Sequence, residues 1–353
     1  MELSGHRDRD VAFYTVSDSN YFLGVVALVN SLRLIGHAEP VVILDCGLTD
    51  RQRELLSAHC TLVPIDPALK TARSAHYYKL IAPRGTGEPI KLIIDSDMIV
   101  TGHLGKLVEA VRAGKVVGFA DPEQDRWFAE WQAIHQLPRV PRHQTYMCSG
   151  FVGFDTRVFP DLLGQWRAAC RRTEDQPEFS EGIADSPTAQ ADQDALNAVL
   201  MGLYPGEAVE FMPYDACVQA GELRWFARVS DLATLACTNR GTKALILHTA
   251  GHPKPWRSPQ ALRRNAFVLL LRRLLSGPDV AIRVDPGMIP TWLRPDLKGR
   301  VQLWSTHWRT LGGDLPWLVR ERLPWLVRER LKRLPFVPAL VSGIRRRMAG
   351  LTQ

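Results

Sequence analysis

Two aspartates at the end of a predicted strand are the first residues in this sequence that could do chemistry. Asp95 and Asp97 directly follow the strand-like run Ile90–Ile94. Carboxylates two residues apart at a strand end can converge on one hard divalent cation, and such a cation commonly bridges the oxygens of a diphosphate. Of the three Asp-x-Asp triplets in the chain, only this one directly follows such a strand. A pair of solvated turn aspartates is the alternative interpretation.

A histidine after a second strand could complete the same site. His248 follows the run 245–247 and opens the sequence His-Thr-Ala-Gly-His-Pro-Lys-Pro-Trp. An imidazole added to two carboxylates shifts the metal preference from Mg²⁺ toward Mn²⁺. Further along, Gly251 allows the backbone to approach a ligand closely, and Lys254 can neutralise a phosphate as a point charge. Taken alone, His248 also fits a histidine whose hydrogen bonds are satisfied inside the core.

Two other polar segments lie where a strand meets a helix. Asp18 and Asn20 follow the first strand, so they suit either hydrogen bonding to a nucleotide or capping of the next helix. Asp192, Gln193 and Asp194 open a predicted helix, where acidic side chains also complement the helix dipole. Both segments keep a structural interpretation beside a functional one.

The elements that must position these residues alternate between strand and helix over the first 120 residues. Strands are predicted at 11–16, 41–45, 61–65, 90–94 and 116–119, and helices at 21–34, from Thr49, before Ile90 and at 104–112. This order of apolar strands predicts an α/β fold with a mostly parallel sheet and helices on both faces. Ligands of such sheets bind beyond the carboxyl ends of the strands, where the polar segments lie.

The second half of the chain is less regular. Strands are predicted at 151–154, 210–212 and 245–248, helices at 160–169 and 191–201, and a polar surface loop at 174–189. The composition changes after Trp256. We therefore expect one domain over residues 1–256 and a basic, helical region rich in tryptophan and arginine over residues 257–353.

Four segments, in this order, resemble the retaining glycosyltransferases of family 8, which include glycogenin and lipopolysaccharide galactosyltransferases. They are Thr15–Tyr21, Leu92–Asp97, Asp192–Asn197 and His248–Trp256. The last is the most diagnostic, and the resemblance covers roughly residues 11–256. It implies that the first domain is catalytic, with the GT-A fold and a UDP-sugar as donor substrate.

The resemblance also assigns roles to individual residues. It implies a manganese ion, with Mg²⁺ as the alternative, held by Asp95, Asp97 and His248. It places Asp192 and Gln193 beside the anomeric carbon as the catalytic pair. The residues that it implies for binding the donor and its diphosphate are Asp18, Asn20, Lys79, Asp95, Ser96, Asp121, Ser149, Gly251 and Lys254.

One position departs from the family pattern. Cys148 precedes Ser149-Gly150 where the family often has Asn. An amide can hydrogen-bond a sugar hydroxyl in two directions, whereas a thiol is a weak partner. The identity of the donor sugar therefore stays open, with galactose and glucose as the expected hexoses.

The resemblance implies that the hexose is transferred with retention to a glycan or glycolipid acceptor, in the synthesis of lipopolysaccharide or another surface polysaccharide. A double displacement needs a strong nucleophile beside the anomeric carbon, and the amide of Gln193 is a poor one. We therefore expect front-face attack by the acceptor hydroxyl, with the UDP phosphate taking its proton.

Charge divides the chain into two unequal parts. The 353 residues are 46% hydrophobic and carry a net charge of +7, which argues against global disorder. Residues 1–256 carry a net charge of −6, and residues 257–353 carry +13. This pattern differs from that of a uniformly basic nucleic-acid binder, so no nucleic-acid partner is expected.

Cysteine spacing and arginine content indicate the source and compartment. None of the six cysteines forms a Cys-x-x-Cys pair, which argues against a structural zinc site and fits reduced thiols in a cytoplasmic protein. The chain has 35 Arg against 9 Lys, as expected of a GC-rich bacterial genome.

The basic region after Trp256 is expected to contact membrane. Its tryptophans include Trp292, Trp304 and Trp308, and it contains the octapeptide LPWLVRER twice. Tryptophan prefers the membrane interface and arginine is drawn to anionic head groups, so we expect peripheral attachment to the cytoplasmic face of the inner membrane. A basic helical subdomain packed on the enzyme is the alternative.

Two other functions compete with the glycosyltransferase hypothesis. A sugar-nucleotide pyrophosphorylase also uses a nucleotide-binding sheet and metal-binding carboxylates. However, no Gly-rich segment with a following basic residue comes after the first strand. A sugar-nucleotide-binding or membrane scaffold protein with impaired catalysis would account for Cys148.

Overall fold

The computed structural model describes residues 10–66, 77–83, 87–176, 185–259 and 265–305. The repeated octapeptide, Trp308 and the rest of the predicted membrane-contacting region beyond residue 305 lie outside the described residues. The same holds for most of the helix expected before Ile90 and for the middle of the predicted 174–189 loop.

A seven-stranded sheet forms the centre of the molecule, in the order β3-β2-β1-β4-β7-β6-β8. Its strands are β1 Val11–Ser17, β2 Val41–Asp45, β3 Thr61–Pro64, β4 Ile90–Ile94, β6 Val116–Ala120, β7 Met147–Asp155 and β8 Val209–Met212. Every pairing is parallel except the two made by β7, which runs antiparallel to β4 and to β6. The predicted α/β fold with a mostly parallel sheet is confirmed.

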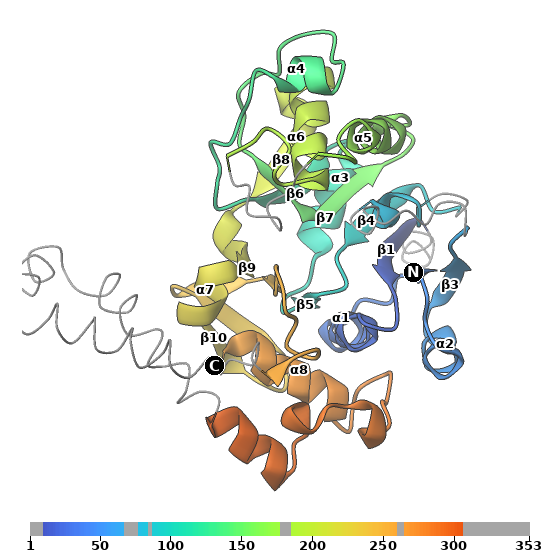
Figure 1. Ribbon diagram of the computed structural model, residues 1–353, viewed down its shortest axis with the longest axis vertical. Helices are drawn as coiled ribbons and strands as arrows, with labels where there is room; N and C mark the ends of the chain where they lie inside the picture. The colour runs from blue at the N-terminus through green and yellow to red at the C-terminus, as the bar shows by residue number, and fades with distance from the viewer. Residues whose placement is uncertain (1–9, 67–76, 84–86, 177–184, 260–264, 306–353) are drawn as a thin grey trace, which may run out of the picture.

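Helices cover both faces of this sheet. One face packs against α1 (Phe22–Ile35) and α3 (Gly105–Arg112), and the other against α5 (Leu162–Arg171) and α6 (Asp192–Leu203) (Figure 1). The α8 helix (Ala266–Ser276) packs on α1. Successive strand residues face opposite sides, so Phe13 lies in the first core and Tyr14 in the second. The α2 helix (Asp50–Ser57) begins after the predicted cap: Thr49 Oγ1 accepts a hydrogen bond from the Gln52 N–H at 3.3 Å.

A second sheet of three short strands, β5-β13-β9, lies against α1 and α8 and carries part of the predicted site. Its strands are β5 Met98–Val100, β13 Ile246–His248 and β9 Cys217–Gln219. The register sets His248 opposite Met98 on one side and opposite Gln219 on the other. Neither β5 nor β9 was predicted, because three residues give too little periodicity to separate a strand from a loop.

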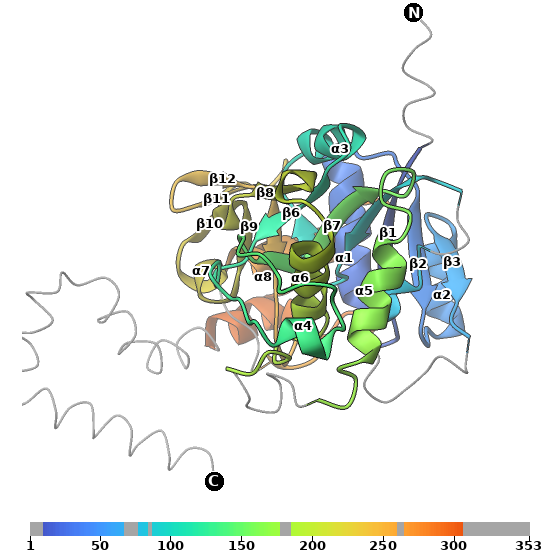
Figure 2. The ribbon, with the colours of Figure 1, turned by 90° about the horizontal axis from the view of Figure 1, so that it is seen from above.

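The other described elements include a third sheet and several short helices. A third sheet contains β10 (Ala227–Asp231), β11 (Ala236–Asn239) and β12 (Thr242–Ala244), on the far side of the molecule from β2 and β3 (Figure 2). Short helices occur at α4 (Trp131–Ile134) and α7 (Ala220–Trp225). No helix among the described residues combines the length and apolar character needed to cross a membrane.

The hydrophobic core continues past Trp256. Phe267, Leu271 and Leu274 of α8 are buried in the same core as α1. The fully buried Asn30 side chain of α1 donates to the carbonyl oxygens of Leu274 and Ile282, both at 2.9 Å, and accepts from the Ile282 N–H at 2.7 Å. The predicted division after Trp256 therefore does not coincide with the edge of the core. The two arginines of α8, Arg272 and Arg273, are partly buried, and most of its apolar residues are fully buried.

Candidate active site

Three predicted metal ligands meet between the seven-stranded sheet and the β5-β13-β9 sheet. Asp95 and Asp97 leave the end of β4, and the Asp95 N–H bonds to the carbonyl oxygen of Gly150 in β7 at 2.9 Å. His248 ends β13. One ligand atom from each of Asp95, Asp97 and His248 lies within 4.8 Å of the others. Two hard carboxylates and one imidazole form a donor set suited to Mn²⁺ or Mg²⁺, so the residues fit the predicted ion.

Two buried lysines neutralise these carboxylates. Lys254 donates to Asp97 Oδ2 and, at 2.8 Å, to the carbonyl oxygen of Thr249. Lys79 lies 3.1 Å from Asp95 Oδ1 and 2.9 Å from Asp192 Oδ2. Both lysines are under 5% exposed, so each ion pair is shielded from water.

The pKa shifts follow from this arrangement. Burial opposes ionisation of Asp97, but the ammonium group of Lys254 and the imidazole of His248 hold the pKa of Asp97 well below its usual range. Burial lowers the pKa of His248, but the Asp97 carboxylate more than compensates and raises it to about 10. Burial also raises the pKa of Asp95 despite the Lys79 charge.

The balance of charge in this cluster bears on what it can bind. Around the two lysines lie the three carboxylates of Asp95, Asp97 and Asp192, so the cluster is negative when the imidazole is neutral. A divalent cation would reverse that sign. An anionic diphosphate would then be attracted to a cluster that is negative with a neutral imidazole and balanced in charge with a protonated one.

A network of neutral amides lies on the other side of the cluster. Gln193, at the start of α6, accepts a hydrogen bond from the Ser149 N–H at 2.9 Å and donates to Asp121 Oδ2 at 3.1 Å. Asp121 follows β6 and also accepts from the side chain of Gln219 at 3.2 Å. Lys79 links the two sides, since it donates to the carbonyl oxygen of Ser149 at 3.0 Å.

Asp194 has a structural role although it belongs to an Asp-x-Asp triplet. It is fully buried, and its carboxylate accepts two bonds from Arg126, at 2.7 and 2.8 Å. It also accepts from the Tyr146 hydroxyl at 2.6 Å and from the Gln190 N–H at 2.8 Å. With these four donors, Asp194 fixes the beginning of α6 and is not exposed to a substrate.

The closing segment packs on the first helix. Trp256 Nε1 donates to the carbonyl oxygen of Asn20 at 2.8 Å, and the Lys254 ammonium lies 5.6 Å from the ring centre of Tyr21. A Cβ at Gly24 would lie 2.5 Å from the Ser96 carbonyl oxygen and 2.8 Å from the Trp256 ring, so this approach requires glycine.

Asp18 and Asn20 bond to each other at the rim of the site. Asp18 Oδ1 accepts from the N–H groups of Asn20 and Tyr21, at 2.8 and 2.9 Å, and Oδ2 accepts from Asn20 Nδ2 at 3.1 Å. These bonds form a turn before α1, whose N-cap residue Tyr21 has no side-chain capping bond, so the predicted capping is not observed. The expected contact of Asp18 and Asn20 with the nucleotide stays a prediction.

Cys148 lies next to His248, one of the three predicted metal ligands. It is 2% exposed, and a hydrogen bond from Cys217 together with the imidazole of His248 lowers the pKa of its thiol to about 6. All six cysteines are free. The site residues that sequence reasoning missed are Gln219 and Cys217. Each lacks a motif of its own and reaches the site through strand pairing or packing. Tyr21 ends the Thr15–Tyr21 motif, but the resemblance assigns it no role.

The structure brings most of the predicted site residues together. They are Lys79, Asp95, Asp97, Asp121, Ser149, Asp192, Gln193, His248 and Lys254. Ser96 is buried in the turn between Asp95 and Asp97. Gly251 lies exposed in the closing segment with a φ of +82°, which favours glycine.

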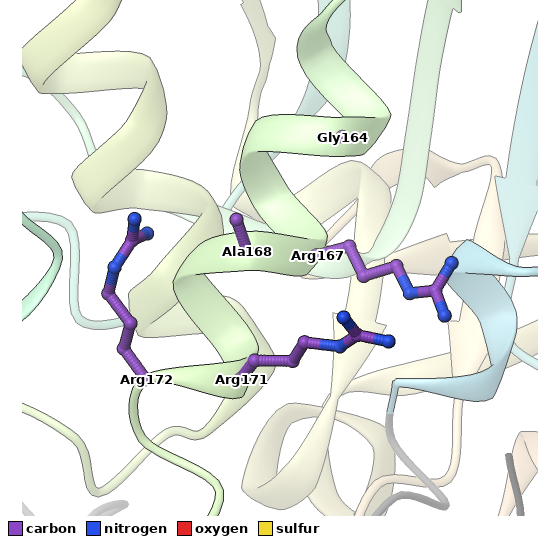
Figure 3. A pocket seen from close by; sticks show the side chains of 5 residues that line it. All are labelled: Gly164, Arg167, Ala168, Arg171 and Arg172. Carbon is purple, nitrogen blue, oxygen red and sulfur yellow. The ribbon is translucent and has the colours of Figure 1, made fainter.

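Two hollows lie outside this site. One, of about 390 Å³, is on the outer surface of α5, where Arg167 and Arg171 extend to one side of the helix and Arg172 to the other (Figure 3). The second, of about 350 Å³, is lined by residues 122–128, directly after Asp121. None of the predicted site residues lines either hollow.

Comparison with solved structures identifies the architecture. An active-site mutant of LgtC superposes with a TM-score of 0.50 and 17% identity over 76% of this chain and 98% of LgtC. The bifunctional glycosyltransferase WbbM, as an apo structure, superposes with a TM-score of 0.51 and 16% identity over 85% of this chain and 52% of WbbM. The fold is the GT-A fold.

A second LgtC structure, described as a galactosyltransferase in complex with donor and acceptor sugar analogues, has a TM-score of 0.49 and 16% identity over 76% of this chain and 98% of LgtC. The sequence matches no protein-family model and no curated protein. At these identities the likeness establishes the fold, and the chemistry must be argued from this chain's own residues.

Proposed function

We propose that this protein is a metal-dependent retaining glycosyltransferase of the family 8 type, which transfers a hexose from a UDP-sugar to a glycan or glycolipid acceptor. The observation that carries the proposal is the cluster of Asp95, Asp97 and His248 within 4.8 Å, flanked by the buried Lys79 and Lys254, on a GT-A fold. The glycosyltransferase likeness of LgtC and WbbM supports it.

The residues suit a leaving diphosphate. A divalent cation, Mn²⁺ by preference, supplies positive charge to the diphosphate when it is held by Asp95, Asp97 and His248. Lys254 lies beside this triad as a preorganised cation, which needs no movement as charge develops on the leaving group. On the other side, Asp121 and Gln193 present a carboxylate and an amide to the hydroxyls of the sugar.

The geometry also supports retention by front-face attack. Asp194 is committed to Arg126 and Tyr146, and Asp192 is paired with Lys79 at 2.9 Å. Gln193 is the remaining residue of the triplet, and its amide is a poor nucleophile. The acceptor hydroxyl then attacks on the face that UDP leaves, and its proton passes to the UDP phosphate. A covalent glycosyl-enzyme detected on Asp192 by mass spectrometry would contradict this mechanism.

Attachment to an anionic membrane surface and a role in surface polysaccharide synthesis are part of the proposal. In support, Leu297, Val301 and Trp304 are 77%, 57% and 59% exposed, and their i, i+4, i+7 spacing is that of one helix face. Flotation with vesicles containing anionic lipid tests attachment. We expect the full-length protein to float and the full-length variant with Leu297, Val301 and Trp304 all changed to Ser to float less, because it loses this apolar face. Equal flotation would contradict the membrane part of the proposal.

The donor reaction tests the enzymatic part. We expect Mn²⁺-dependent release of UDP from at least one member of a panel of UDP-hexoses, and a loss of at least about 100-fold in Asp97→Asn, because a metal-binding charge is removed. Asp231→Asn, which removes an exposed carboxylate on β10, is the matched control.

Two results would replace this proposal with an alternative. UDP binding without release from any donor would indicate a scaffold protein with impaired catalysis. Formation of UTP from a UDP-sugar and pyrophosphate would indicate a pyrophosphorylase.

A further inference from the structure

Gln219 occupies a position between the two sheets that build the site. It ends β9 and is the register partner of His248 in the neighbouring parallel strand β13. Its side chain is nearly buried, at 8% exposure, and Nε2 donates to Asp121 Oδ2 at 3.2 Å. Asp121 follows β6 of the large sheet. One hydrogen bond therefore joins the strand pair that carries a metal ligand to the strand that ends beside the expected donor sugar.

The Asp121 carboxylate is almost fully occupied by hydrogen bonds. Oδ2 accepts from both Gln193 and Gln219, at 3.1 and 3.2 Å, and Oδ1 accepts from the Glu123 N–H at 3.0 Å. An ionised carboxylate offers about four acceptor positions. Asp121 can thus take about one further hydroxyl without releasing an amide, and the two amides fix the direction in which that position points.

Gln219 is the amide that can be altered with least disturbance. Gln193 belongs to the start of α6, and its carbonyl oxygen also binds the Ser149 N–H. Gln219 reaches Asp121 from a different sheet and is not part of that helix. Because an ionised carboxylate accepts only, the Gln219 NH₂ group must face Asp121, as the bond from Nε2 requires.

We propose that Gln219 is a positioning residue that sets donor-sugar specificity, by holding Asp121 so that its one remaining acceptor position selects between hexoses that are epimers at a single hydroxyl. The inference rests on the proposed function, since it requires a UDP-hexose in the site. The nucleotide portion of the donor lies outside its reach, because Asp121 and Gln219 belong to the amide network and not to the cluster around Lys254.

The experiment compares Gln219→Met with the wild type in the full-length protein loaded with Mn²⁺. Methionine keeps the length and approximate volume of glutamine but cannot donate to a carboxylate. Gln165→Met is the matched control, because Gln165, on α5, also loses one side-chain hydrogen bond, which it accepts from the Tyr204 hydroxyl. The probes are UDP, UDP-glucose and UDP-galactose, each measured by calorimetric binding and by UDP release.

For Gln219→Met we expect kcat/KM for the preferred UDP-hexose to fall about tenfold and the ratio between the two hexoses to shrink by a similar factor, because a hydrogen bond to a charged group is lost. The Kd of UDP should stay within about twofold, and Gln165→Met should match the wild type.

Unchanged discrimination between the two hexoses in Gln219→Met would overturn the inference. So would a parallel weakening of UDP itself, which would indicate a general structural role. Absence of UDP release in the wild type would count against the proposed function alone, because the Kd values of the two UDP-hexoses relative to UDP still test Gln219.

Discussion

The site has two halves with opposite physical characters. The charged half consists of Lys79, Asp95, Asp97, His248 and Lys254, which are held together by ion pairs out of water. The amide half consists of Asp121, Ser149, Gln193 and Gln219, which are joined by hydrogen bonds from neutral donors. Charge suits the binding of a diphosphate at any orientation, whereas directional amides suit the recognition of particular hydroxyls. The two halves should therefore respond differently to substitution.

The largest expected effect concerns the support of the amide half. Arg126→Met would leave the Asp194 carboxylate buried without its ionic partner, at a cost of about 3–5 kcal/mol in the free energy of unfolding. Urea unfolding of both proteins measures this difference. Arg157→Met, which removes an exposed partner of Asp155, is the control and should cost far less. Equal losses would show that the Asp194 network does not hold α6.

The next largest effect concerns the charged half, and it should differ between ligands with and without phosphate. Lys254→Met removes the ammonium group from Asp97 and should weaken binding of UDP and of UDP-hexoses alike, by about 100-fold, because a buried charge pair is broken. Binding of uridine, which lacks phosphate, should change little. Calorimetry with the three ligands measures the comparison, and a loss that affects UDP-hexoses but spares UDP would contradict the assignment of Lys254 to the charged half.

A smaller effect is expected where the halves touch. Cys148→Asn supplies an amide in place of the buried thiol, so we expect the preference between UDP-glucose and UDP-galactose to change by about tenfold while the Kd of UDP stays the same. Rates of UDP release from both donors give the preference. Cys148→Ser is the control, because serine is close to cysteine in size and lacks the amide. Cys170→Asn is unsuitable as a control because the Cys170 thiol is buried in the hydrophobic core.

The smallest expected effect is a pH dependence of stability that arises from His135. Burial lowers the pKa of His135 to about 4, whereas an unfolded histidine titrates near 6.5. Below about pH 6.5 the unfolded chain therefore binds a proton that the folded protein excludes, and stability falls as the pH falls. Between pH 7.5 and 5.5 we expect a loss of about 1 kcal/mol that His135→Asn lacks. Urea midpoints at the two pH values test this, and identical losses in both proteins would exclude His135 as the cause.

Most of the charged half could be predicted from sequence because its residues lie within or next to recognisable motifs. Asp95 and Asp97 follow an easily recognised strand, and His248 and Lys254 lie in one nine-residue segment. The amide half could be predicted only in part. Gln219 lies on a strand of three residues, and nothing in its neighbours indicates that β9 pairs with β13. Strand pairing over long separations is decided by the packing of the whole core, which a local pattern does not contain.

The same reason explains why the sequence did not predict that the core continues beyond Trp256. Composition separates the two parts of the chain by charge, but net charge does not show that the buried leucines of α8 pack on α1. The strand positions of the large sheet were predicted closely, since buried parallel strands are continuous apolar runs.

The side chain of Asn30 has a consequence for shortened versions of the protein. Among the described residues, its amide is bonded by backbone groups of Leu274 and Ile282, some 250 residues later in the chain. A chain that ends at Trp256 holds every predicted active-site residue, but it leaves the Asn30 side of α1 open to water because α8 no longer covers it. We therefore expect a fragment cut at the edge of the family resemblance to be less stable than the whole protein.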